Sequence, residues 1–515
     1  MTTLNRRISR RQLLKLLGIG AGTAILSACA PQAAPTAAPA PTTAAAEATA
    51  APTLAPEEAT AAAATPTPGG NAAASAGGNA ADIAETWDIG QQAFGGYDVQ
   101  HPSNPVTLTV WAWSGDQTDP WVLSELEILK EFQQKYPEIK LDIQPTPTDL
   151  DTKVNAAIAA KQGPDILYES DREAEYPRRG VIRDIPEEVI PMDFIKKHNF
   201  YQVRPLDDGK LYWIHCRAMG PIIYANKALL AEAGLKPTDV PKTWEEFGKF
   251  AQQLTKASGG QMSQAGFAFN GYARYIWDDM MYQQKAHVYT KDKSFIDSNE
   301  SYNAWQMLVD MYDRFKVNDR TFLNYDEAFG TGKAAMTQVW TWFGATLEAN
   351  YPDVDWVPVT YPTFTGEGPY GRFDYDGISW MVTTLAEGDR MLAGYELMKF
   401  TAHQYKLLVD SAHTEGSIFT AVPHPDYEKM FSDVAAVEQP TQEQRRTQSL
   451  GVLARQFQGG MVFPGEVAAP FDDMWKKMEE AILLNREPIK DVLKQYQGLY
   501  DEMLKQTHFW ITPEA

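Results

Sequence analysis

The sequence predicts an α/β fold with two lobes, and three observations lead to that prediction. Apolar and polar residues alternate like a strand in 106–113, and helix-like and strand-like segments then follow in turn as far as residue 170. Strand, helix, strand, helix, strand is the order typical of a parallel sheet. The globular part has about 430 residues without a second low-complexity break, whereas single cores stop growing near about 250 to 300 residues.

The first 28 residues are predicted to be an export signal. Basic residues at 6–15 precede an apolar run at 16–28, which is too short for a membrane-spanning helix of about 20 apolar residues. SRRQLLK at 9–15 is similar to the twin-arginine consensus, and LSAC at 26–29 is similar to a bacterial lipobox. That resemblance implies that Cys29 carries lipid and anchors the protein to the cell membrane on the extracytoplasmic side. A cleaved signal with an incidental cysteine is the alternative.

Residues 29–82 are predicted to be the anchor and a disordered linker. From 30 to 80 the chain is almost wholly Ala, Pro, Thr, Gly, Ser and Asn, and Leu54 is its one large apolar side chain. Such a composition does not build a core. A flexible tether of this length spans about 40 Å, which would let the folded body move above its anchor.

Charge and cysteine content exclude several classes of function. The formal net charge of −21 makes nucleic acid and anionic membrane surfaces poor partners. With Cys29 lipidated, Cys216 has no cysteine to pair with, and a buried thiol is its default role. No HExxH or GxSxG motif is present, and the eight histidines show no metal-ligand spacing, so we expect no metal and no cofactor.

The first α/β elements of the globular part follow from local patterns. Ser124 and Glu127 have the spacing of a capping box at the start of a helix. The helix would bury Leu126, Leu129 and Phe132 on one face. The expected order is a strand at 106–113, a turn at 114–120, this helix, a strand at 139–143, a helix at 151–161 and a strand at 165–170.

Aromatic and charged residues gather where these strands end. Ligands of open parallel sheets bind beyond the carboxyl ends of the strands. Trp111, Trp113 and Asp116 fall at that end of the first strand, and Asp171 and Arg172 at that end of the third. Burial under a helix explains one of the two tryptophans as well as ligand contact does, and a surface ion pair is the alternative for Asp171 and Arg172.

Four segments together resemble the extracellular solute-binding proteins, family 1, of sugar ABC transporters. They are KQGPDILYESDR, LDDGKLYWIHCRAMGPIIYANKALLAEAGL, PKTWEEFGKFAQQLT and FGTGKAAMTQVWTWF, and a closing helical part, MWKKMEEAILLNREPIKDVLKQYQGLYDEML, also fits. The resemblance covers nearly the whole globular body, and the combination is specific although each piece alone is not.

That resemblance implies a periplasmic-binding-protein-like fold, in which two lobes, each a sheet flanked by helices, are joined by three hinge crossings. The crossings are expected near Gly220, Gly377 and Ser417. One lobe would then comprise 100–219 plus 378–416, and the other 220–377 plus 417–515.

Within the family, the maltose-binding branch suggests individual ligand contacts. TVWAWSGDQ aligns without a gap, so Asp116 takes the position of a hydroxyl-binding aspartate, although Gln117 stands where that branch has lysine. The Asp171–Arg172 pair is present one residue earlier than there. Trp340 matches a stacking tryptophan, although the loop before it is two residues shorter.

Four further residues are candidates for the same site. Trp342 follows Trp340 at strand spacing and is either core or a stacking residue. Trp277 has two alternative roles: it lines the cleft between the predicted lobes, or it is buried in the core beside a helix. Asp376 and Trp380 lie around the second crossing, where the family often contacts its solute.

The expected function is a monomeric, extracytoplasmic receptor that binds a sugar or oligosaccharide without changing it and delivers it to an ABC permease in the membrane. Aromatic rings cover the C–H faces of sugars, while carboxylates, amides and guanidinium groups bind the hydroxyls. Two alternatives stay open: a secreted carbohydrate-active enzyme, which needs two carboxylates about 5 to 9.5 Å apart, and a binder of oligopeptides. The sequence does not say which sugar is bound.

Overall fold

The computed structural model describes most of the chain after residue 101. The described residues are 102–112, 120–145, 150–169, 175–189, 205–206, 208–215, 217–290, 293–371, 374–375, 379–403, 419–420, 431–434, 437–458, 466–467, 471–506 and 510–511. The predicted export signal, Cys29, the linker and Cys216 therefore lie outside the described residues.

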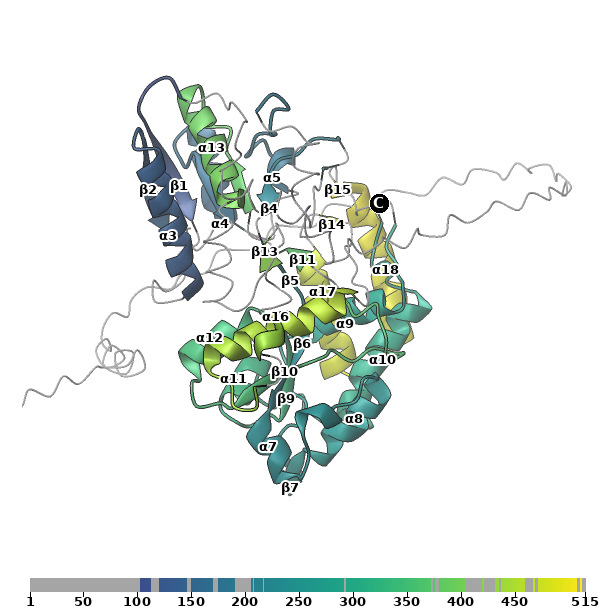
Figure 1. Ribbon diagram of the computed structural model, residues 1–515. Helices are drawn as coiled ribbons and strands as arrows, with labels where there is room; N and C mark the ends of the chain where they lie inside the picture. The colour runs from purple at the N-terminus through teal and green to yellow at the C-terminus, as the bar shows by residue number, and fades with distance from the viewer. Residues whose placement is uncertain are drawn as a thin grey trace, which may run out of the picture. The chain divides into compact units, whose positions relative to one another are not determined.

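Helices and strands are mixed along this part of the chain (Figure 1). The strands are β1 (Val106–Ala112), β2 (Ile139–Pro145), β3 (Ile166–Glu169), β4 (Ile214–His215), β5 (Arg217–Met219), β6 (Pro221–Asn226), β7 (Lys256–Ser258), β8 (Gln261–Gln264), β9 (Met336–Trp340), β10 (Trp356–Val359), β11 (Asp374–Tyr375), β12 (Ser379–Val382), β13 (Phe419–Thr420), β14 (Glu466–Val467) and β15 (Trp510–Ile511). The helices are α3 (Pro120–Lys135), α4 (Leu150–Ala160), α5 (Glu175–Arg178), α7 (Lys227–Glu232), η1 (Pro237–Asp239), α8 (Trp244–Gln253), α9 (Ala273–Gln283), α10 (Asn299–Asp313), α11 (Tyr325–Gly330), α12 (Phe343–Asn350), α13 (Asp389–His403), α16 (Gln442–Gln458), α17 (Phe471–Glu479), η2 (Glu480–Leu484) and α18 (Ile489–Gln506).

The first sheet has the strand order β2-β1-β3-β12-β4. β1 runs parallel to β2 and β3, as the strand–helix–strand pattern predicts, whereas β12 is antiparallel to its neighbours β3 and β4. Helix α13 packs on β1 and β12. Asp165, just before β3, accepts a hydrogen bond from the Thr109 N–H at 3.0 Å and an ion pair from Arg390 at 2.6 Å, so its role is structural.

The second sheet has the order β10-β6-β9 and is antiparallel. Its residues alternate between two covered faces, since successive side chains of a strand point to opposite sides. Ile223, Ala225 and Met336 belong to the core that α8, α9 and α10 complete. Ile222, Tyr224, Val339 and Trp356 belong to the core on the other face, to which α11 and α12 also contribute.

A third, short sheet joins three segments that are far apart in the chain. β5 lies between β11 and β13, with Ala218 opposite both Tyr375 and Phe419. These strands adjoin the three places where the sequence predicts hinge crossings. The division into lobes at these points stays a prediction.

The C-terminal helices complete a core rather than standing apart. Trp475 and Met478 of α17, with Leu493 and Tyr500 of α18, are buried in the same cluster as α8, α9 and α10. Among the described helices, none is long and apolar enough to cross a membrane.

Two local predictions need correction. Helix α3 begins at Pro120, so Ser124 lies inside the helix and is not its N-cap; proline is favoured in the first turn because its missing N–H has no partner there in any case. Strand β9 ends at Trp340, and Trp342 is the N-cap residue of α12. Trp342 therefore does not continue the strand face of Trp340.

Candidate functional site

Trp340 occupies the carboxyl end of β9. It lies opposite Pro221 in the neighbouring strand, and its carbonyl oxygen accepts a hydrogen bond from the Tyr224 hydroxyl at 3.1 Å. The side chain is only 6% exposed. The strand end therefore fixes the main chain of Trp340, and the indole lies almost covered by its neighbours.

Three tyrosines surround Trp340 and form with it what we call the aromatic cluster: Trp340, Tyr272, Tyr275 and Tyr325. The ring of Tyr275 meets the indole edge to face, with centroids 6.0 Å apart at 67°. Tyr272 lies 4.5 Å from Tyr275 and 4.8 Å from Tyr325. Burial raises the pKa of Tyr272 well above its ordinary value, so its hydroxyl stays protonated and remains a hydrogen-bond donor.

Sequence reasoning missed Tyr272 and Tyr275, although the stretch NGYARYIW was noted for Trp277. Tyr272 is the N-cap residue of α9, and Tyr275 lies in its first turn. A spacing of three residues puts two side chains on one helix face. This spacing is the signal that could have found them.

Two polar side chains of α9, Asp279 and Gln283, are buried, and Asp279 interacts electrostatically with Tyr272 of the aromatic cluster. Asp279 is 1% exposed, and burial, together with the Asp279 carboxylate, raises the pKa of Tyr361 well above its ordinary value. A Cβ on Gly371 would stand 2.6 Å from Oδ1 of Asp279, so this glycine lets the main chain pass the carboxylate. Gln283 accepts a hydrogen bond from the Trp244 indole at 2.8 Å.

Trp277 lies in a core made by three tryptophans. It is fully buried, its centroid is 5.9 Å from that of Trp305 and 5.8 Å from that of Trp475, and its indole N–H donates to the Ser301 carbonyl at 3.4 Å. The contacts fasten α9 to α10 and α17. This is the position that the helix-core alternative predicts.

Trp380 is also a core side chain in this structure. It lies on β12 opposite Tyr168 of β3, is 1% exposed, and stacks on the tyrosine ring with centroids 4.3 Å apart and planes 24° apart. The two rings fill the core of the first sheet.

Trp111 and Trp342 are partly buried. The Trp111 indole N–H donates to Oε1 of Gln144 on β2 at 3.2 Å, and the ring packs on the core of β3 and α4. The Trp342 ring meets Phe343 edge on at 5.8 Å. Of the predicted set, Trp113, Asp116, Asp171, Arg172 and Asp376 lie outside the described residues.

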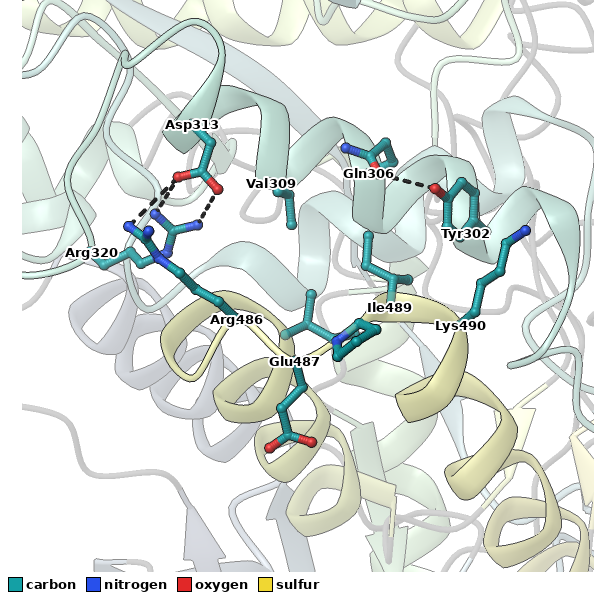
Figure 2. Close-up of a pocket in the computed structure, with 11 residues that line it drawn as sticks. Tyr302, Gln306, Val309, Asp313, Arg320, Arg486, Glu487, Ile489 and Lys490 are labelled. Carbon is teal, nitrogen blue, oxygen red and sulfur yellow. Dashed lines mark hydrogen bonds and ion pairs between the residues drawn. The ribbon is translucent and has the colours of Figure 1, made fainter.

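A separate pocket of about 390 Å³ lies between α10 and the turn from η2 to α18, and none of the predicted site residues lines it. Figure 2 shows Asp313, Arg320 and Arg486 together at one end, and Tyr302, Gln306 and Lys490 toward the other. Arg320 binds Asp313 through two hydrogen bonds of 2.8 and 3.0 Å, and these hold the pKa of Asp313 below its ordinary value. In the described part of the chain, no cluster of His, Cys, Asp and Glu could hold a metal ion.

Comparison with known proteins gives a family and a fold. The profile of the bacterial extracellular solute-binding proteins matches residues 127–405. No sequence among the curated proteins matches the chain.

Solved structures of similar fold include three that are named for, or bound to, different solutes. The maltose/maltodextrin-binding domain MalE from Bdellovibrio bacteriovorus, bound to maltotriose, has a TM-score of 0.60 at 16% identity and covers 78% of this chain and 100% of its own. The cyclic α-maltosyl-1,6-maltose binding protein from Arthrobacter globiformis has a TM-score of 0.61 at 19% identity, covering 78% and 100%. UgpB from Mycobacterium tuberculosis, in complex with glycerophosphocholine, has a TM-score of 0.59 at 16% identity, covering 78% and 99%.

These likenesses establish the mixed α/β, periplasmic-binding-protein-like fold that the sequence predicts. The family binds solutes and is not catalytic, which removes the enzyme alternative. The chain belongs to the bacterial extracellular solute-binding protein family.

Proposed function

We propose that the protein captures a neutral sugar or oligosaccharide between its two predicted lobes and delivers it to an ABC permease. The aromatic cluster carries the proposal. The rings of Trp340, Tyr272 and Tyr275 contact one another at a strand end, and the buried carboxylate of Asp279 interacts electrostatically with Tyr272. Rings suit the C–H faces of a sugar, and polar groups beside them suit its hydroxyls.

Among the predicted ligand residues, Trp340 keeps the main role. Tyr275 joins it as a second ring, whereas the burial of Trp277 and Trp380 in two cores favours packing for both. Trp111, Trp113, Asp116, Asp171 and Arg172 are proposed to contribute from the other lobe, Asp376 from beside the second predicted crossing, and Trp342 from the edge of the cluster.

A binding panel tests the choice of solute. Titration calorimetry would compare maltotriose, mannotriose, tagatose, glycerophosphocholine and a mixture of short peptides. We expect a neutral sugar to bind most tightly and to raise the melting temperature by mass action. Preference for glycerophosphocholine or for peptide would contradict the proposal, and the structural neighbour UgpB makes the phosphodiester the strongest competitor.

We also propose that lipid on Cys29 holds the protein at the extracytoplasmic face of the membrane. The support is the sequence LSAC at 26–29 after a basic and apolar leader. Cys29→Ser should abolish incorporation of labelled fatty acid and release the protein from membranes. Equal labelling of wild type and variant would show that another residue is modified.

A further inference from the structure

Gln338 is a buried amide on an otherwise apolar strand face. It lies on β9 between Met336 and Trp340 at strand spacing, so the three side chains share one face. It is 0% exposed, and among the described residues neither its amide nitrogen nor its amide oxygen has a hydrogen-bond partner. Native structures rarely leave such a group unsatisfied, because desolvating an amide without a partner is costly.

The neighbours of Gln338 on its own sheet do not satisfy the amide. In the adjacent strand it lies opposite Ile223, and on the other side Thr337 forms a bridge with Ala268, which places Phe267 and Phe269 on the Gln338 face. Thr337 itself is satisfied, because its hydroxyl donates to the Ala268 carbonyl at 2.8 Å on the opposite face. The sequence has thus placed an amide where an apolar side chain would fold more stably.

The aromatic residues near Gln338 indicate a role for its amide. Trp340 is the next residue at the same spacing on β9, and Tyr361, whose pKa is raised by burial and by the Asp279 carboxylate, lies in the core that contains Met336. The Trp340 ring is 6% exposed with Tyr275 edge on to it, so it must turn outward before a sugar can lie on its face. If the Trp340 ring rotated outward in this way, the part of the β9 face that carries Gln338 would become accessible.

We propose that Gln338 forms the inner end of the solute site and hydrogen-bonds a solute hydroxyl once Trp340 has turned. An amide both donates and accepts, which matches a hydroxyl. A phosphodiester would bring negative charge into a core that already holds the Asp279 carboxylate, so the site should select a neutral polyol over such an anion. The inference rests on the proposed function, since it assumes that solute binds at Trp340.

The test compares Gln338→Leu with wild type in the full chain. Leucine removes the unsatisfied amide at similar size, so we expect the melting temperature without solute to rise by roughly 2 °C. Affinity for maltotriose or mannotriose, whichever binds wild type more tightly, should fall by about tenfold because a solute hydroxyl loses its partner. Met336→Leu, two residues away on the same buried face, is the matched control and should leave affinity unchanged.

Three other outcomes would contradict this inference or the proposed function. If Gln338→Leu and the unbranched Gln338→Met both bind sugar as wild type does, this inference is wrong while the proposed function stands. If both variants melt well below Met336→Leu, the amide is satisfied in solution and supports the fold, which also overturns the inference. If wild type prefers glycerophosphocholine to both sugars, the proposed sugar class fails as well.

Discussion

Trp340 shows why a role in ligand contact is hard to separate from a role in core packing. Trp340 is 6% exposed and belongs to a core cluster, so truncation to alanine would cost both binding and folding, since large core truncations cost about 3 to 5 kcal/mol. The pattern AAMTQVWTWF does not reveal this, because period-two spacing marks a strand face but not what covers it.

Trp340→Phe is therefore the sharper variant. It keeps an aromatic face, and we expect affinity for the bound sugar to fall several-fold while the fold is retained. Its matched control is Trp356→Phe on β10, a fully buried tryptophan of the same core cluster. The control should lower the melting temperature and leave affinity per folded molecule intact. Equal affinities for Trp340→Phe and wild type would move the stacking role to Tyr275 or Trp342.

Glu479 gives the molecule a pH dependence of stability. Burial raises the pKa of Glu479 to about 7, against the opposing charge of Arg274 on α9; Tyr312 on α10 also interacts with it electrostatically. The folded state thus holds a proton that the unfolded chain releases near its ordinary pKa. This contribution to stability is complete below about pH 4.5 and is lost as the pH rises through about 7.

Glu479→Gln should remove that dependence. Near pH 5 the variant and wild type should unfold at similar urea concentrations. At pH 8 the variant should be more stable by roughly 2 kcal/mol, because wild type then carries a buried carboxylate. Parallel urea titrations at the two pH values measure the difference, and a constant gap across pH would show that Glu479 titrates normally.

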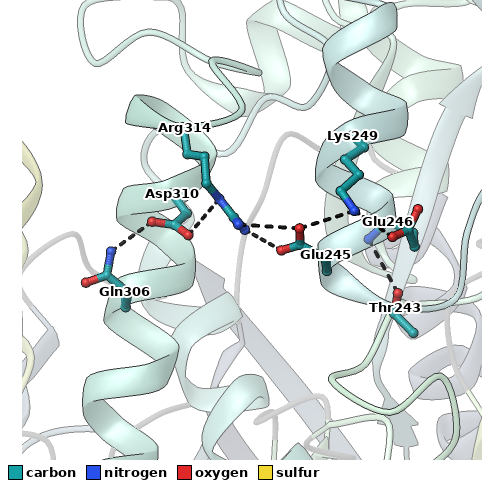
Figure 3. A network of polar contacts seen from close by, with 7 residues as sticks. All are labelled: Thr243, Glu245, Glu246, Lys249, Gln306, Asp310 and Arg314. Atoms are coloured by element: carbon teal, nitrogen blue, oxygen red, sulfur yellow. Dashed lines mark hydrogen bonds and ion pairs between the residues drawn. The ribbon is translucent and has the colours of Figure 1, made fainter.

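At the scale of elements, α8 and α10 are joined by a surface network of charges (Figure 3). Arg314 pairs with Glu245 of α8 and, at 2.9 Å, with Asp310 of its own helix. Lys249 adds a contact to Glu245 at 3.3 Å, and Gln306 donates to Asp310 at 2.8 Å. The arginine is half exposed, so its pairs are screened by solvent.

Arg314→Met should therefore cost less than about 1 kcal/mol of unfolding free energy, and the loss should shrink at high salt. Methionine keeps the aliphatic contact with Phe315, over whose ring the guanidinium lies at 4.1 Å. Urea titrations at about 0.05 M and about 1 M salt measure the effect. A large loss that does not depend on salt would assign the role of Arg314 to packing instead.

The sequence predicted which helices and strands are present better than it predicted the residues at which they begin and end. The parallel order of β2, β1 and β3 followed from periodicity and was confirmed. The start of α3 was wrong, because Ser124 and Glu127 satisfy a capping pattern that also occurs inside helices, and Pro120 supplied the real start. Trp277 was left open between core and cleft because the tryptophans that bury it, Trp305 and Trp475, come from distant segments.

The candidate site could be predicted only in part. Trp340 was predicted because its segment resembles the family's stacking position, and its ligand role stays a prediction, whereas Tyr275 became a candidate only through its ring contact with Trp340. Gln338 could not be found from sequence, since an amide within a strand has no pattern of its own. Gln338 stands out because its amide is buried without a hydrogen-bond partner among the described residues, and only the folded structure shows this.

At the scale of the whole molecule, the short sheet β11-β5-β13 is relevant to the expected closing of the two predicted lobes on the solute. β11 and β13 each pair with β5, and the three strands come from segments that adjoin all three predicted crossings. Three connections that share main-chain hydrogen bonds would bend together, which suits a hinge motion in which a few terminal residues of elements change conformation. We therefore expect two states that differ by rotation of the predicted lobes.

Solute should shift the population toward the closed state, because only there can both lobes contact it, and a ligand shifts an equilibrium by its differential affinity for the two states. Small-angle scattering of residues 83–515, which omits the predicted linker, should show a smaller radius of gyration with saturating sugar. A sugar from the panel that does not bind serves as the control for solvent contrast. Gln338→Leu at saturation should still close, because Trp340 and the opposite lobe remain to bridge the solute. An unchanged radius at saturation would mean that one lobe alone holds the solute, and the assignment of Asp116, Asp171 and Arg172 to the opposite wall would then be wrong.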